Sequence, residues 1–92
     1  MLRWEKRFIA AEAFESAAFI DIDGDGVIDV ASGGFWYRGP DFVSRTPIAD
    51  VARHGDYYDD FGSIALDVHD TGLPDLITGG WWGESIRWRE NP

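Results

Sequence analysis

The residues best suited to chemistry are four aspartates in one short stretch, DIDGDGVID at positions 21–29. Counted from Asp21, they occupy loop positions 1, 3, 5 and 9, with glycine at position 6 and Val27 at position 7. These match the first nine positions of an oxygen-rich Ca²⁺ loop, in which alternate side chains face one cavity and position 7 offers its carbonyl. Because calcium prefers oxygen donors, the stretch predicts a calcium loop rather than a zinc or copper site.

The residues that follow this loop separate it from a helix-loop-helix calcium site. Position 12 is Ser32 instead of the bidentate glutamate, and the neighbouring residues are typical of strands. The stretch is therefore expected to connect two antiparallel strands. The alternative is that the aspartates accept hydrogen bonds from their own backbone in Asx-turns and need no metal.

The composition limits the other possible functions. The 92 residues suffice for one small domain, and 17 acidic against 8 basic side chains give a net charge of −9. This charge argues against nucleic acid or an anionic membrane as the main partner. Without cysteine there are no disulfides or thiolate metal sites. No apolar run approaches the roughly 18 residues of a membrane span, and residues 1–7 lack the apolar core of a secretory signal.

An internal repeat is the most informative feature of the whole chain. The segment DIDGDGVIDVASGGFW at 21–36 returns as DVHDTGLPDLITGGWW at 67–82, at a constant offset of 46 residues. The identical pairs are Asp21/Asp67, Gly26/Gly72, Asp29/Asp75, Gly33/Gly79, Gly34/Gly80 and Trp36/Trp82. A period of this length is typical of propeller blades and of a few helical repeats.

The segments around the repeat favour strands, because they are short, rich in β-branched and aromatic residues, and separated by glycine and aspartate turns. A helix at 10–18 competes on alanine and glutamate content alone, and we expect at most a short turn there. The prediction is an all-β fold of two four-stranded blades, 1–40 and 41–92, in one continuous domain. The predicted strands are 4–10, 17–22, 27–33 and 35–38, then 42–50, 63–68, 75–82 and 85–90.

These motifs resemble the FG-GAP or VCBS-type repeats, which build calcium-binding β-propellers. The resemblance rests on the D-x-D-x-D-G-x-x-D loop, the Gly-Gly pair after it, and FGSIALDVHD at 61–70. It spans residues 14–36 and 61–82 and implies an extracellular or periplasmic setting. The implied calcium ligands are Asp21, Asp23, Asp25, the Val27 carbonyl and Asp29.

The second loop departs from the ligand pattern. His69 and Thr71 replace two of the aspartates, and Pro74 is added. Histidine is a poor calcium ligand compared with a carboxylate, so we expect weak calcium binding there, or Asx-turns without metal. The weaker candidate ligands are Asp67, Thr71, Leu73 and Asp75.

The aromatic residues after the Gly-Gly pairs have two interpretations. Trp36, Tyr37, Trp81 and Trp82 could form a platform for stacking sugars, or they could pack between blades. Packing is favoured because large aromatic side chains dominate core burial. The same packing is expected for the two remaining tryptophans, Trp4 and Trp88.

Catalytic patterns are sparse. A base, a cation and carboxylates gather at one polar aromatic loop, whose candidate ligand-binding residues are Arg53, His54, Tyr57 and Tyr58. A solvated loop covering a blade edge is the competing interpretation. There is no phosphate-binding glycine loop, nucleophile elbow or zinc helix motif.

Two blades leave two apolar faces open, because repeat units are stabilised by their neighbours. We therefore expect either further blades of a longer parent chain or self-association into a closed propeller. The leading hypothesis is a calcium-stabilised, non-catalytic binding or scaffold module, whose ligand could be carbohydrate or protein. The alternatives are part of a rhamnogalacturonan-lyase-like propeller enzyme acting on polysaccharide, and a small oligomeric carbohydrate-binding lectin.

Overall fold

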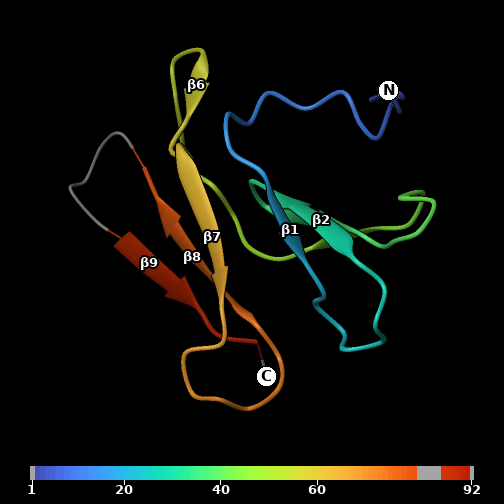
Figure 1. The fold of residues 1–92 in the computed structure, drawn as a ribbon. Helices are drawn as coiled ribbons and strands as arrows, with labels where there is room; N and C mark the ends of the chain where they lie inside the picture. The colour runs from blue at the N-terminus through green and yellow to red at the C-terminus, as the bar shows by residue number, and fades with distance from the viewer. Residues whose placement is uncertain (1, 81–85, 92) are drawn as a thin grey trace.

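The computed structural model describes residues 2–80 and 86–91, and these residues form strands, turns and loops without a helix (Figure 1). The prediction of an all-β chain is confirmed. The strands are β1 (Ala18–Ile20), β2 (Asp29–Ser32), β3 (Phe35–Tyr37), β4 (Arg45–Pro47), β5 (Arg53–His54), β6 (Tyr57–Tyr58), β7 (Gly62–Leu66), β8 (Asp75–Gly79) and β9 (Ile86–Arg89).

The strands form three antiparallel sheets of sequential neighbours. The first sheet has the order β1-β2-β3-β4, and the third has the order β7-β8-β9. The second sheet, between them in the sequence, is the small hairpin of β5 and β6. The loop at 21–28 connects β1 with β2, and the loop at 67–74 connects β7 with β8. Both aspartate-containing segments therefore link adjacent antiparallel strands, as expected.

The repeat offset changes along the chain. Strands β1 and β2 correspond to β7 and β8 at the predicted offset of 46, but Ala31 pairs with Trp36 while its counterpart Ile77 pairs with Trp88. The third strand is therefore displaced by six further residues, and Trp88 is the structural counterpart of Trp36. The sequence alignment of Trp36 with Trp82 is not the strand register, and Trp82 lies outside the described residues.

The fourth strand of the first sheet differs from the prediction. We expected residues 4–10 to supply a strand and residues 42–50 to belong to the second unit. Instead, β4 pairs with β3 through Trp36 and Thr46, and no strand forms over 4–10. The connection from β3 to β4 is short, so β4 reaches the edge of β3 at low entropic cost. Pro47 ends the edge strand, where proline is tolerated.

The core lies between the first and third sheets. Ile20, Ala31 and Leu76 are buried there, with Trp36 and Ala65 packed against them. Strand β1 lies beside β7 where the two sheets approach each other (Figure 1). One face of each sheet therefore meets the other sheet, and each sheet has an opposite face that this contact does not cover.

Residues 9–14, here called the strap, lie over the opposite face of the first sheet. The Glu12 carboxylate accepts a 3.2 Å hydrogen bond from the Tyr37 hydroxyl and pairs with Arg45 at 2.8 Å. The Phe14 ring contacts Phe35 and Tyr58, with centroid distances of 6.3 and 4.6 Å. The strap covers this face without adding a strand to the sheet.

The expected burial of Trp4 and Trp88 is wrong for the single chain. Trp4 is 89% exposed, because the segment that carries it joins no sheet. Trp88 is 46% exposed on the outer face of the third sheet, where an edge-on contact with His69 and a side-chain hydrogen bond with Asp75 leave it only partly covered. Both exposures follow from surfaces that no other part of the described chain covers.

Candidate metal centre

Asp21 shapes the first loop through its backbone contacts. One carboxylate oxygen accepts the Gly24 N–H at 3.0 Å, and the other accepts the Gly26 N–H at 2.9 Å. Both glycines adopt positive φ angles, 71° and 83°, which residues with a Cβ rarely tolerate. The glycines thus permit the bend, and the Asp21 carboxylate holds it closed.

Asp29 anchors the end of the loop and is completely buried. Its Oδ2 atom accepts the Ile22 N–H at 3.0 Å, and Oδ1 accepts the Gly39 N–H at 2.8 Å. These bonds connect the start of β2 to the end of β1 and to the segment after β3. A buried carboxylate with two backbone donors is an organised element of the fold, and each oxygen keeps a lone pair for another partner.

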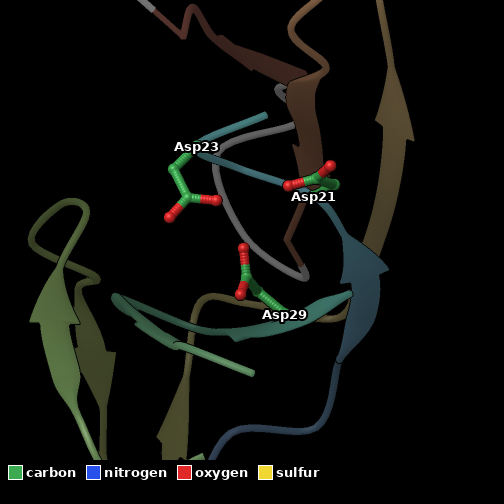
Figure 2. A group of neighbouring side chains, drawn as sticks. All are labelled: Asp21, Asp23 and Asp29. Carbon is green, nitrogen blue, oxygen red and sulfur yellow. The ribbon is translucent and has the colours of Figure 1, made fainter. Parts of the chain in front are cut away.

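The side chains of Asp21, Asp23 and Asp29 converge. One carboxylate oxygen from each lies within 4.8 Å of the others, and Figure 2 shows the three groups facing a common space. Within residues 2–80 and 86–91 this is the only such group of three or more acidic or histidine side chains. Its hard oxygen donors suit calcium.

The remaining two predicted ligands lie differently. The Asp25 carboxylate accepts the Val27 N–H at 2.8 Å and is outside the converging group. This hydrogen bond is the main reason why the pKa of Asp25 lies below its ordinary value. Asp25 therefore supports the loop turn in the structure described, and Val27 lies at the end of that turn.

The loop carries more negative charge than its protein partners neutralise. Desolvation, followed by repulsion from Asp25 and Asp29, raises the pKa of Asp23. The Arg38 guanidinium is the nearby cation, 3.2 Å from Asp23 and 3.7 Å from Asp25. A divalent cation among these carboxylates would relieve the repulsion, so the residues present fit a calcium ion.

The second loop is closed by its own hydrogen bonds. Asp67 accepts the Thr71 N–H at 3.0 Å and the Gly72 N–H at 2.8 Å, which hold the pKa of Asp67 below its ordinary value. The Thr71 hydroxyl lies 3.3 Å from both the N–H and the carbonyl oxygen of Leu73. Three of the four weaker candidates thus make a turn that needs no ion to satisfy its polar groups.

Asp75 has the anchoring role of Asp29 in the second unit. Its carboxylate accepts the Asn91 N–H at 2.8 Å and the Val68 N–H at 3.3 Å, and the Asn91 bond is the leading cause of its lowered pKa. The Asn91 amide also donates to the carbonyls of Ile22 and Pro74. Asn91 therefore connects the start of the first loop to the end of the second.

The sequence offered little indication of two residues at these sites. Arg38 and Asn91 lie outside the repeated loop motifs and reach them only after the third strand of each sheet returns. Their side-chain types are compatible with these roles, but the strand register decides where they lie. The one indication in the sequence was that Arg38 is a basic residue at the end of the predicted strand that contains Phe35 and Trp36.

The candidate polar loop forms the β5–β6 hairpin. Register brings Arg53 opposite Tyr58 and His54 opposite Tyr57. The Arg53 Nε donates to the Gly55 carbonyl at 2.8 Å, and its guanidinium lies 5.7 Å from the Tyr58 ring centre. Tyr58 also packs against Phe14 of the strap. The hairpin therefore brings all four candidate residues together.

The aromatic candidates separate by burial. Tyr37 is only 3% exposed, and Trp36 lines a cavity of about 320 Å³ between the two large sheets. Arg89 lines the same cavity, and its buried Nε lacks a hydrogen-bond partner. Trp81 and Trp82 lie outside the described residues. Both side chains therefore pack, Tyr37 beneath the strap and Trp36 against the core, and Trp36 also borders the cavity.

Comparison with family models, curated proteins and solved structures found no match to this chain. No helix of the described residues is long and apolar enough to cross a membrane.

Proposed function

We propose that the chain is a calcium-stabilised β-propeller repeat module that serves as a non-catalytic binding or scaffold unit. The observation that carries this proposal is the convergence of Asp21, Asp23 and Asp29 in a glycine-bent loop between two strands. The blade interpretation is supported by two similar antiparallel sheets that pack through a shared core, with β1 beside β7. Calcium near millimolar in an extracellular or periplasmic setting would suit a site of modest affinity.

Calcium would supply a fixed divalent charge to the first loop. Asp21 preserves the bend by accepting two backbone N–H groups, and Asp29 joins the loop to Ile22 and Gly39. Asp23 contributes the most exposed carboxylate of the converging group, held near Arg38. Because the same residues organise the strand ends, neutralising their repulsion should stabilise the first sheet.

Calorimetric titration with CaCl₂ tests the proposal directly. We expect one binding event per chain in wild type and a loss of affinity of about tenfold or more in Asp23→Ala, since calcium affinity follows ligand charge. Asp50→Ala is the matched control, because it removes an exposed aspartate outside the loop. Calcium should also raise the melting temperature of wild type and of Asp50→Ala.

A result with equal calcium affinity and equal thermal shifts in Asp23→Ala and wild type would contradict the metal assignment. Titration with MgCl₂ adds a check on the donor set. Magnesium demands a smaller, near-octahedral shell and dehydrates reluctantly, so we expect it to bind more weakly than calcium in this loop.

A further inference from the structure

The two large sheets each have a face of the same type, related by the internal repeat. In the first sheet this face packs against the third sheet and contains Ala18, Ile20, Ala31 and Trp36. The strand registers place its counterpart in the third sheet at Ile64, Leu66, Ile77 and Trp88. We call this second set the open face, because Ile64 is 65% exposed, Leu66 54% and Trp88 46%.

The opposite faces are related in the same way. The face of the third sheet that packs in the core contains Ala65, Leu76, Thr78 and Arg89. Its counterpart in the first sheet, here called the strap face, contains Phe19, Val30, Ser32 and Tyr37. The internal contact of the molecule therefore joins one face type to the other. Outside this contact the open face is exposed, whereas the strap covers the strap face except at Phe19.

We infer that the open face docks a second copy of this chain, which receives it on its strap face. The contact would repeat the arrangement already present between the first and third sheets. Such a head-to-tail contact joins different surfaces of identical chains, and it can continue or close into a ring. This inference rests on the proposed propeller arrangement and adds the partner and the two surfaces.

The exposed apolar residues support this partner. Ile64 and Leu66 lie on β7, an edge strand of the third sheet, and Phe19, 75% exposed, lies on β1, the matching edge strand of the first sheet. A second copy would remove both sets from water in one contact, which is the main driving force for association. Asp75 lies on the same side of the sheet, opposite Leu66, but it is only 3% exposed.

The strap limits how much of the receiving surface is free. Val30 is 9% exposed and Tyr37 is 3% exposed beneath it, whereas Phe19 remains outside its cover. Docking would therefore begin at Phe19, and a complete contact requires the strap to move away. Glu12 holds the strap through Tyr37 and Arg45, so these contacts set the resistance to displacement.

Sedimentation velocity of the full chain tests the inference, over concentrations from about 1 µM to 1 mM, which span micromolar to millimolar dissociation constants. We expect wild type to associate with increasing concentration. Ile64→Glu and Phe19→Glu should each weaken association about tenfold or more, because each places an unpaired charge in the contact. Val43→Glu is the matched control, since Val43 is 80% exposed and lies outside both faces.

Mixing the two variants identifies the geometry. The Phe19→Glu chain keeps an intact open face, and the Ile64→Glu chain keeps an intact strap face. A head-to-tail contact therefore predicts that the mixture forms one-to-one dimers at concentrations where each variant alone is monomeric. Since both substituted positions are exposed, circular dichroism melts should show folded variants.

Three results would each overturn the inference: wild type monomeric throughout, Phe19→Glu associating as well as wild type, or a mixture that remains monomeric. Calcium titration of the wild-type chain, beside its sedimentation, separates this failure from that of the metal proposal. Calcium binding without association overturns only the docking, and association without calcium binding overturns only the metal loop.

Discussion

Replacing Asp29 with alanine should destabilise the chain strongly even without metal. The substitution removes the acceptor for a buried Gly39 N–H at 2.8 Å and a part-buried Ile22 N–H at 3.0 Å. An unsatisfied buried donor costs about 1–3 kcal/mol. Because the Ile22 N–H retains some access to water, we expect a total loss of about 2–4 kcal/mol in the free energy of unfolding.

This loss is large relative to the stability of a small domain. At about 0.05–0.15 kcal/mol per residue, a chain of this length has roughly 5–14 kcal/mol in total. Asp29→Asn keeps one acceptor oxygen and should lose about half as much as Asp29→Ala, because one of the two N–H groups stays paired.

Urea unfolding in excess chelator measures this effect without a contribution from calcium. The loss should appear as a lower transition midpoint at an unchanged slope with denaturant, since the surface exposed on unfolding remains similar. Asp50→Ala serves again as the control for removing one negative charge. A loss below about 1 kcal/mol for Asp29→Ala would refute the reasoning, because one orphaned buried donor alone should cost that much.

Two further predictions concern acid and the strap. Backbone N–H donors hold the pKa values of Asp25, Asp67 and Asp75 below the ordinary value. These aspartates therefore stabilise the fold at pH values above their pKa in the unfolded chain, and this stability should disappear as the pH falls through their lower pKa values in the folded chain. Asp23, with a raised pKa, acts in the opposite sense. Because three lowered pKa values stand against one raised value, the urea midpoint should fall as the pH is lowered from about 6 to about 2.5, a range that brackets the pKa of an unperturbed aspartate. A constant midpoint would contradict this balance. Glu12→Ala should release the strap and strengthen association in sedimentation velocity, whereas unchanged or weaker association would show that the strap does not oppose docking.

Features encoded over short distances could be predicted from the sequence. The alternating aspartates, the two glycines and the neighbouring apolar residues placed a bent loop between strands, and the structure has β1 and β2 on either side of 21–28. The predictions at 63–68 and 85–90 overlap β7 and β9. These elements depend on turn chemistry and local strand preference, which a few consecutive residues specify.

Tertiary structure alone decided which distant segments meet. Residues 4–10 have strand-forming side chains but form no strand, and the fourth strand of the first sheet is β4, which pairs with β3. The six-residue displacement that matches Trp36 with Trp88 depends on where β9 returns to β8. Likewise, Asn91 reaches Asp75 only through that return. The spacing of residues along the chain specifies each loop, whereas the pairing of strands and the packing of sheet faces determine which distant residues lie beside it.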